Sequence, residues 1–364
     1  MIDRTQDEIV KAWQGDKTKP IVSIRCTAYN HEKYISQCLD GFLIQETTFP
    51  FEIVIHDDAS TDKTVSIIQE YEKKYPRIIK PIYETENQYS KGNGALARIL
   101  DSHMWGKYIA FCEGDDYWTH PNKLQAQYDA LEAHPELGIC FGRVQFVDSN
   151  GNAVGHIAPD NIDYANNIIT YLDYANLEFK KGSWSFHTSS FFLRTSIYMQ
   201  YVLERQGDLY GEFPYGDMAI IHYFLLHSSG YLVPKIIGCY RMFSGGYNSY
   251  VLTHPEFAVV QEKKLISALT KFNIFLNYKY DNQIKSRIFR GQVKIAKIEN
   301  NRKQLKYLYR SEVFKKIGTK KEKVYAFIEL YCPNCYDLLK KIKHSCVSSY
   351  IRRLWARFKD IIFK

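Results

Sequence analysis

The segment KYIAFCEGDDYW, residues 107–118, places an apolar run directly before three acids and two aromatic residues. A short apolar run bounded by turn residues predicts a buried strand. Glu113, Asp115 and Asp116 would repel one another at this spacing unless a cation lies among them. The segment therefore predicts a strand that ends in an acidic turn, and the rest of the chain must supply the sheet around it.

Similar apolar runs lie on both sides of this segment within the first 150 residues. The predicted strands are residues 20–29, 51–58, 78–83, 107–112 and 138–147, and the predicted helices are residues 32–45, 61–75, 94–104 and 122–134. Asn30 is the expected N-cap of the first helix, and Ser60 or Thr61 that of the second. Strands that alternate with helices predict an α/β fold, in which a mixed, mostly parallel sheet carries helices on both faces.

Polar side chains follow three of these strands, at the point where each strand ends. They are Thr27, Tyr29 and Asn30 after the first strand, Asp57 and Asp58 after the second, and Glu113 to Asp116 after the fourth. Ligands of open parallel sheets bind beyond the carboxyl ends of the strands. The sequence therefore predicts one polar rim that is built from three separate segments.

The acidic turn has the chemistry of a site for a hard divalent cation. Gly114 allows a sharp turn, so Glu113 and Asp115 can point to the same side. Mg²⁺ or Mn²⁺ prefers oxygen ligands and, when held by one or two carboxylates, keeps positions open for substrate phosphates. A solvated acidic turn without a metal is the alternative that this segment alone leaves open.

The second half of the chain is less regular. Residues 151–182 read as a loop-rich insertion, residues 185–194 as a strand, residues 218–230 as a helix and residues 231–243 as a strand with a bend at Pro234. Residues 1–19 are expected to lead into the folded core. From residue 254 to residue 364 the pattern predicts a helical, increasingly basic region.

Positive charge is concentrated at the end of the chain. The net charge of the whole sequence is +8, and residues 301–364 hold 17 Lys and Arg against 5 Asp and Glu. Residues 349–364 predict a basic amphipathic helix, which either lies on an anionic membrane or packs on the protein. Neither an apolar run of about 20 residues nor a signal-peptide pattern is present. We therefore expect a cytoplasmic protein, and the membrane-bound alternative would place its basic helices on the inner face of the cell membrane.

Seven of the eight cysteines fall into two groups. Four of the eight lie in the apolar runs of the first 150 residues and are expected to be buried, reduced thiols. The other group with chemical interest is Cys332, Cys335, His344 and Cys346, whose spacing can bind zinc. The segment between them reads as helix rather than as the turns of a zinc site, which makes zinc the less favoured interpretation.

Three motifs resemble a known family. The runs VSIRCTAYNHEKYISQCLDGFLIQ, FEIVIHDDASTDKT and KYIAFCEGDDYWTHPNKL, in this order, are similar to the N-terminal half of family 2 glycosyltransferases. The resemblance is close over residues 20–148 and looser to about residue 246, through PYGDMAI and YRMFSGG. It implies a GT-A fold over residues 20–253, with a nucleotide-sugar half at 20–148 and an acceptor half at 149–253, and an inverting transfer from a nucleotide-diphosphate sugar.

Carried over by position, the resemblance assigns a nucleotide-sugar site and a metal site. The nucleotide-sugar residues are Thr27, Tyr29, Asn30, Asp57, Asp58, Arg98, Glu113, Asp116 and Arg241, and the metal residues are Asp115 and Glu113. Tyr29 is expected to stack on the base, and Asp58 to accept a hydrogen bond from the uracil ring N–H. Asp115 stands at the metal-binding acid of the family's DxD motif, with Mn²⁺ or Mg²⁺ as the cofactor. Glu113 replaces the first Asp of that motif.

Two departures from the family pattern affect the predicted diphosphate contacts. Arg98 is followed by Ile99 instead of the usual Asn, and the segment after Arg241 has Phe243 in place of the usual His. Arg98 and Arg241 are still expected to lie near the diphosphate, whereas the role of that His has no counterpart here.

Asp217, in PYGDMAI, matches the acid on the acceptor side of the family and is the expected catalytic base. Burial would raise its pKa toward the range that suits a base at neutral pH. The alternative is an ordinary acid in the first turn of a helix, which the helix dipole stabilises. Acceptor specificity is expected from residues 151–216, where Trp184, His187, Tyr210 and Tyr215 are either acceptor contacts or core residues.

The usual function of this family implies a UDP-sugar donor, a glycan or lipid-linked acceptor and a role in bacterial cell-surface polysaccharide synthesis. An inactive nucleotide-sugar-binding protein is the main alternative, although binding alone would not require Asp217. A nucleotidyltransferase would normally show a Gly-rich loop near the first strand, and TAYNHEKY contains no Gly. GxxxxGK[ST] is absent, which excludes a P-loop kinase. Nucleic acid is not an expected partner, because the positive charge is segregated from the acidic rim.

Overall fold

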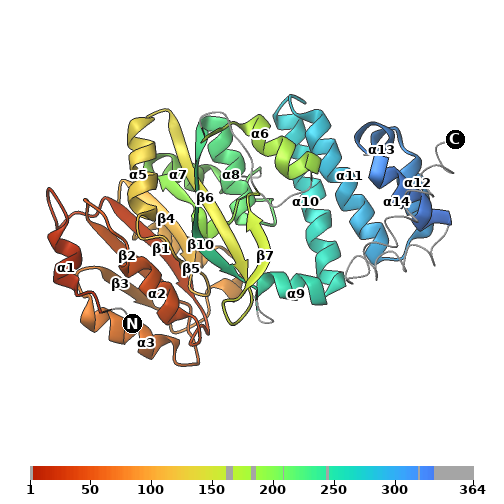
Figure 1. Cartoon of the computed structure of the whole chain (residues 1–364). Coiled ribbons are helices and arrows are strands. Elements are labelled where there is room, and N and C mark those ends of the chain that lie inside the picture. The colour runs from red at the N-terminus through yellow and green to blue at the C-terminus, as the bar shows by residue number, and fades with distance from the viewer. Residues whose placement is uncertain are drawn as a thin grey trace, which may run out of the picture. The chain divides into compact units, whose positions relative to one another are not determined.

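The computed structural model describes residues 3–160, 167–181, 186–207, 209–242, 246–318 and 320–331. The chain divides into two compact units, Met1–Tyr280 and Asp281–Lys364. The first unit contains the sheet that is shown in Figure 1. Its last helices, α9 (Tyr247–Thr253) and α10 (Pro255–Phe275), place its end beyond residue 253, where the sequence predicted a boundary. Within the described residues no helix is both long and apolar enough to cross a membrane.

Four parallel strands form the N-terminal part of the sheet. They are β1 (Val22–Ala28), β2 (Phe51–Asp57), β3 (Ile79–Tyr83) and β4 (Tyr108–Glu113), in the spatial order β3-β2-β1-β4. β1 pairs in parallel with both β2 and β4. These are the strands that the sequence predicted, with bounds that differ by a few residues.

The sheet continues through strands of both directions. They are β5 (Tyr117–Trp118), β6 (Leu137–Val147), β7 (Ala153–Ala158), β8 (Ile168–Ile169), β9 (Phe192–Arg194) and β10 (Ser229–Arg241). β9 is antiparallel to β4 and β6, whereas β10 runs parallel to β6. The register of β10 shifts between Val233 and Ile236, where the sequence predicted a bend at Pro234. The predicted α/β class with a mixed, mostly parallel sheet is confirmed.

Helices cover both faces of this sheet. α1 (Gln6–Lys11), α2 (Ile35–Leu43), α3 (Thr64–Lys74) and α5 (Lys123–Ala133) contribute to one apolar core with β1 and β2. On the other face, Arg25 of β1 lies 3.5 Å from Asp101 of α4 (Ala95–Asp101), and the ring of Phe111 lies 5.6 Å from that of Tyr198 in α7 (Thr195–Glu204). The alternation of side chains along β1 thus separates an apolar face from a face that carries a charge.

The predicted loop-rich insertion contains more regular structure than expected. It holds β7, β8, α6 (Tyr171–Ala175) and the π-helix η3 (Asn176–Lys181). β7 forms a hairpin with β6 because Asp148 accepts backbone N–H bonds from Asn150 and Asn152 and Gly151 has a φ of +87°. The alternation that marks a strand is absent from β7, whose side chains are mostly exposed at the sheet edge.

The predicted strand at residues 185–194 is mostly not a strand. Of its described residues, 186–194, only Phe192–Arg194 belongs to the sheet, and Thr188–Ser190 forms the short 3₁₀ helix η4. Polar side chains cause the difference, since Ser189 N donates to His187 Nδ1 and Ser190 Oγ donates to the His187 carbonyl.

Lys123, at the start of α5, is a fully buried lysine. Its Nζ donates to Gln127 Oε1 at 2.7 Å and lies 3.8 Å from the centre of the Trp118 ring. Burial lowers the pKa of Lys123 to about 7. The core therefore contains an amine whose charge changes near neutral pH.

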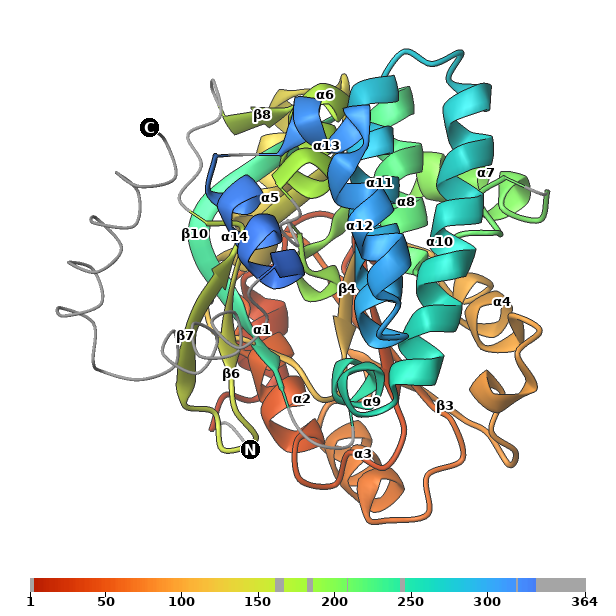
Figure 2. The ribbon, with the colours of Figure 1, turned by 90° about the vertical axis from the view of Figure 1, so that its right-hand side faces the viewer.

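The second unit is helical in its described part (Figure 2). It comprises α11 (Asp281–Ile298), α12 (Arg302–Arg310), α13 (Glu312–Ile317) and α14 (Lys320–Tyr331). Its apolar core is formed by Phe289, Ala296, Leu305, Leu308, Phe314 and Ala326. The predicted helical, basic region is confirmed over these helices. The predicted amphipathic helix at residues 349–364 and the zinc candidates Cys332, Cys335, His344 and Cys346 lie outside the described residues.

Candidate functional site

The carboxyl ends of β1, β2 and β4 meet at one edge of the sheet, as the sequence predicted. The backbone continues the ladder past each strand end. Gly114 N donates to the Thr27 carbonyl at 2.8 Å, and Asp58 N donates to the Ala28 carbonyl at 2.9 Å. The predicted polar rim is therefore a single hydrogen-bonded structure.

The acidic turn after β4 is tight. Asp116 N donates to the Glu113 carbonyl at 3.0 Å, which closes the turn. A Cβ added to Gly114 would lie 2.9 Å from His31 Nδ1 and 3.0 Å from the Thr27 carbonyl. Any larger residue there must displace β1 or the loop that follows it.

We expect Gly114→Ala to lower the free energy of unfolding by about 1–3 kcal/mol, the usual cost of adding a methyl group to a packed position. Urea unfolding measures this change. Gly216→Ala is the matched control, because a Cβ at exposed Gly216 meets nothing within 4 Å. Equal unfolding midpoints for the two variants would contradict the close approach around Gly114.

Glu113 carries an unsatisfied oxygen at this turn. Its Oε2 is buried and has no hydrogen-bond partner among the described residues. Burial, with smaller contributions from the charges of Asp115 and Asp217, raises the pKa of Glu113 to about 7, and the charge of Arg25 opposes this rise. Burial therefore disfavours the ionised carboxyl, and an added cation would favour it.

Asp116 is buried and stabilises the acidic turn through a hydrogen bond. Its carboxylate accepts a hydrogen bond from Arg241 N at 2.9 Å. Burial, together with the charges of Asp115 and Glu113, raises the pKa of Asp116 well above its ordinary value. His187 Nδ1 lies 3.7 Å away, but burial lowers the pKa of His187 to about 3, so the imidazole is neutral and forms no ion pair. The sequence predicted Asp116 as a nucleotide-sugar residue, and the hydrogen bond that it accepts from Arg241 N shows that it also orients the turn.

The oxygen chemistry of the turn fits a divalent metal. Asp115 and the unpartnered Glu113 Oε2 offer hard ligands, which Mg²⁺ and Mn²⁺ prefer. No group of three or more His, Cys, Asp or Glu side chains within the described residues is placed to hold a metal without help. Ligands from a bound substrate would have to complete the coordination shell.

Asp217 lies in the first turn of α8 (Gly216–His227). Its Oδ1 accepts a hydrogen bond from Met218 N at 2.7 Å. Burial raises the pKa of Asp217, and backbone hydrogen bonds partly offset this effect. Because its charge acts on Glu113, Asp217 belongs to the same electrostatic cluster as the acidic turn. These two residues lie far apart in the sequence, yet their charges interact in the folded chain.

Arg241 has a different environment from the one predicted. Its guanidinium is buried and donates to the carbonyls of Asp115, Asp148 and Ser149 and to Gln37 Oε1. It also lies 4.5 Å from the centre of the Tyr34 ring. These four bonds use all but one of the five guanidinium N–H donors, so Arg241 holds the acidic turn in place, and its contact with a diphosphate stays a prediction.

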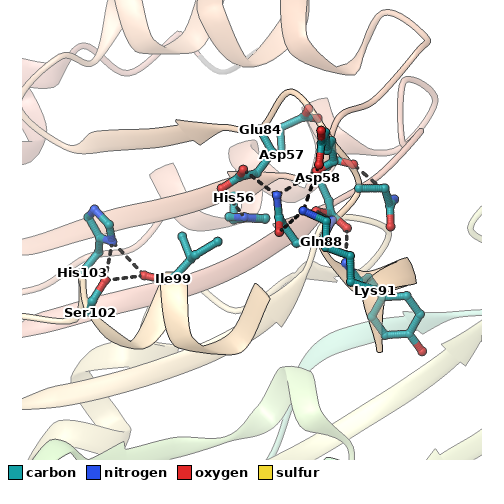
Figure 3. Close-up of polar contacts among 12 residues, drawn as sticks. His56, Asp57, Asp58, Glu84, Gln88, Lys91, Ile99, Ser102 and His103 are labelled. Carbon is teal, nitrogen blue, oxygen red and sulfur yellow. Dashed lines mark hydrogen bonds and ion pairs between the residues drawn. The ribbon is translucent and has the colours of Figure 1, made fainter. Parts of the chain in front are cut away.

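Asp58 is also committed to the protein backbone, as Figure 3 shows. Its carboxylate accepts hydrogen bonds from Gln88 N at 2.7 Å and from Tyr89 N at 3.0 Å. Gln88 in turn donates to Glu84 Oε2 and accepts from Lys91 Nζ, each at 3.0 Å. Asp58 therefore fixes residues 84–91, including the 3₁₀ helix η1 (Tyr89–Lys91), and a base N–H would have to share the same carboxylate.

The loops after β1 and β2 are joined by hydrogen bonds. Asn30, at a φ of 54°, accepts from Thr61 N through its side chain and donates its own N–H to Ser60 Oγ. His31 N donates to Thr64 Oγ1 at 2.8 Å. The predicted caps are therefore wrong: α2 begins at Ile35 and α3 at Thr64, and the polar side chains link the two loops instead.

Three other predicted site residues differ in their exposure and in their hydrogen bonds. Tyr29 is 45% exposed at the rim, which leaves its ring free to stack on a base. Asp57 is buried, with Oδ2 bound to Ser60 N and Oδ1 without a partner in the described residues. Arg98 is exposed on α4 and donates to the Asn93 carbonyl at 2.6 Å. Nothing in the described contacts joins Arg98 to the acidic turn.

Two residues of the site were missed by sequence reasoning. His31 Nδ1 is buried beside Gly114 without a hydrogen-bond partner in the described residues, and burial lowers the pKa of His31 against the charge of Asp115. Arg25 sits under the rim, where its charge lowers the pKa of Glu113. Two features of the sequence could have identified them: His31 directly follows Tyr29 and Asn30, and Arg25 is a charged residue inside an apolar strand.

Two of the four candidate acceptor contacts are core residues. His187 and Tyr210 are 4% exposed, so neither presents a surface to a sugar. Tyr215 is the residue before α8 and is only partly buried. Trp184 lies outside the described residues.

Comparison with known proteins agrees with the motifs and the fold. A family model described as "Glycosyl transferase family 2" matches residues 23–201. An uncharacterized protein of Mycobacterium tuberculosis is 44% identical over 140 residues, which are 38% of this chain and 39% of that protein. The UDP-Glc:alpha-D-GlcNAc-diphosphoundecaprenol beta-1,3-glucosyltransferase WfgD of Escherichia coli is 26% identical over 144 residues, 40% of this chain and 53% of that protein. This chain thus spans between two fifths and about half of these relatives.

A solved structure supports the fold over a longer range. The mannosyltransferase PcManGT from Pyrobaculum calidifontis, in complex with GDP-Man and Mn²⁺, superposes with a TM-score of 0.52 at 16% identity, covering 93% of this chain and 88% of that chain. At this identity the likeness concerns the fold alone. The resemblance that the three motifs indicated is confirmed, since the glycosyl transferase family 2 model matches residues 23–201 of this chain.

Proposed function

We propose that this chain is an inverting glycosyltransferase, which moves a sugar from a nucleotide-diphosphate sugar to an acceptor hydroxyl. The observation that supports the proposal is the acidic turn of Glu113 and Asp115 after β4, together with Asp217 of α8, whose charge acts on Glu113. A pair of acids suited to a metal and a partly buried acid with a raised pKa are the two parts that this reaction needs.

Asp115, with Glu113 as a second oxygen donor, would hold Mn²⁺ or Mg²⁺. When bound, the metal would neutralise the negative charge that develops on the leaving diphosphate. The unpartnered Oε2 of Glu113 supports this assignment. The complex of PcManGT with GDP-Man and Mn²⁺ is in keeping with it.

The protein's own side chains would carry the rest of the reaction. Asp217 accepts the proton of the acceptor hydroxyl while that oxygen forms a bond to the anomeric carbon from the face opposite the nucleotide. The bond between the anomeric carbon and the diphosphate oxygen breaks with its electron pair on the diphosphate. One such displacement inverts the configuration. Tyr29 stacks on the base, and Thr27, Asn30 and the Asp58-anchored loop line its pocket.

We propose a UDP-sugar as the donor and a glycan or lipid-linked sugar as the acceptor, in the assembly of a bacterial cell-surface polysaccharide. The relative WfgD is named for a UDP-glucose donor and a lipid-diphosphate acceptor. Arg98, which is exposed and bound only to a backbone carbonyl in its own segment, remains a candidate contact of the diphosphate.

The test of the metal site is the affinity for UDP with Mn²⁺ and with a chelator, measured by calorimetry. We expect wild-type protein to bind UDP more tightly with Mn²⁺, and Asp115→Ala to lose that gain entirely. Asp129→Ala, which removes an exposed acid of α5, is the control and should behave like wild type. Equal metal-dependent affinities in wild type and Asp115→Ala would exclude the assignment.

A further inference from the structure

The second unit carries far more positive than negative charge, and the charges are unevenly distributed. Residues 281–331 contain 14 Lys and Arg against 5 Asp and Glu. Four of the five acids pair within the unit, in the ion pairs Asp281–Lys285, Arg290–Glu322, Lys297–Glu329 and Lys315–Glu312. None of these four pairs involves α12.

The outer face of α12 is basic and contains an exposed ring. Lys303, Lys306, Tyr307 and Arg310 recur at intervals of three and four residues and share one exposed face. None of the three cations has a carboxylate partner among the described residues. The opposite face holds the buried Leu305 and Leu308, so the basic face is fixed outward by the core of the unit.

Two aromatic residues of α14 extend this face. Arg310 donates to the Tyr331 hydroxyl at 2.7 Å, and the rings of Tyr331 and Phe327 lie 4.9 Å apart. Tyr307, Phe327 and Tyr331 are 70%, 49% and 50% exposed. Figure 2 shows the two helices that carry them. The result is a basic–aromatic patch made of Lys303, Lys306, Tyr307, Arg310, Phe327 and Tyr331.

We infer that the basic–aromatic patch binds the surface of an anionic lipid membrane. Lys and Arg near such a surface are attracted to its anionic headgroups, and each contributes about 1 kcal/mol. Tyr and Phe rings favour the boundary between headgroups and acyl chains. The patch lies on the outward faces of two helices, which suits a planar partner better than a single strand of nucleic acid, whose sites track the strand along a groove. The inference rests on this unit alone and does not depend on the proposed sugar transfer.

The experiment is co-sedimentation of the full chain with vesicles of phosphatidylcholine, with and without phosphatidylglycerol. Wild-type protein should bind the anionic vesicles and not the neutral ones. The triple variant Lys303→Gln/Lys306→Gln/Arg310→Gln should lose affinity for the anionic vesicles on the order of 100-fold. The matched control Lys11→Gln/Lys73→Gln/Arg77→Gln removes the same charges from exposed positions in the first unit and should keep wild-type binding.

A second variant separates an interfacial contact from simple charge attraction. Tyr307→Ser/Phe327→Ser keeps every charge, and it should weaken binding most visibly at high salt, where the electrostatic part is screened. Unchanged binding by this variant would overturn the interfacial mode. Wild-type indifference to phosphatidylglycerol, or equal loss in the triple variant and its control, would overturn the inference. So would tight binding of a single-stranded oligonucleotide that only the triple variant loses. No nucleotide sugar is present, so these outcomes leave the proposed function untouched.

Discussion

Replacing Asp217 with Asn should reduce the rate of sugar transfer by about 10²–10⁴-fold, the usual contribution of a general base. The amide keeps the oxygen that accepts the hydrogen bond from Met218 N, so α8 should start in the same way. The amide cannot take a proton from the acceptor hydroxyl, so the chemical step should slow. UDP release in single-turnover reactions measures the chemical step, and calorimetry measures UDP affinity, which should stay near the wild-type value.

The matched control for this variant is Asp7→Asn. Asp7 is likewise an acid in the first turn of a helix, but it is exposed and lies far along the chain from the rim. The Asp7→Asn variant should transfer sugar at the wild-type rate. Wild-type turnover in Asp217→Asn would show that Asp217 is only a first-turn acid that the helix dipole stabilises. A loss of UDP affinity as large as the loss of rate would show that Asp217 binds the donor and is not the general base.

Lys123 should make stability depend on pH across the range from about 7 to 10.5. The unfolded chain holds the proton of this lysine up to its ordinary pKa of about 10.5, whereas burial lowers the pKa in the folded protein to about 7. Between these values the unfolded state binds more protons, so the free energy of unfolding rises with pH. Relative to Lys123→Met, wild type should gain stability by about 1.4 kcal/mol per pH unit, approaching 5 kcal/mol over the window.

Urea unfolding of both proteins at several pH values measures this difference, and the comparison cancels other titrating groups. Loss of the hydrogen bond to Gln127 shifts Lys123→Met by the same amount at every pH and leaves the slope unaffected. Lys107→Met, at an exposed lysine, is the control and should show no such slope. A flat difference for Lys123→Met would mean that the Trp118 ring keeps the amine charged inside the core.

The strands and their ends could be predicted because they depend on local patterns. Apolar runs in alternation with helices identified β1 to β4, and the polar residues at their ends identified the rim. What the sequence does not record is which hydrogen bonds a polar side chain makes. Asn30 and Asp58 are of residue types that cap helices or bind ligands. In the fold, both join loops that are about 30 residues apart.

Two polar residues whose surroundings the sequence did not show have a common physical origin. Arg241 and His187 are polar groups that the core itself satisfies, through backbone carbonyls in one case and Ser189 in the other. Their type alone does not separate a buried, satisfied group from a ligand contact. The electrostatic interaction between Glu113 and Asp217 depends on the crossover connections of the whole sheet. These connections cannot be read from a single sequence.

The bonds that join the loops after β1 and β2 have a consequence for the kinetics of donor capture. Thr61, His31 and Asn30 are immobilised before any nucleotide arrives, so much of the conformational entropy of these loops is already lost during folding. Association should then be a single fast phase in stopped-flow fluorescence, whose rate grows linearly with nucleotide concentration and shows no slow isomerisation.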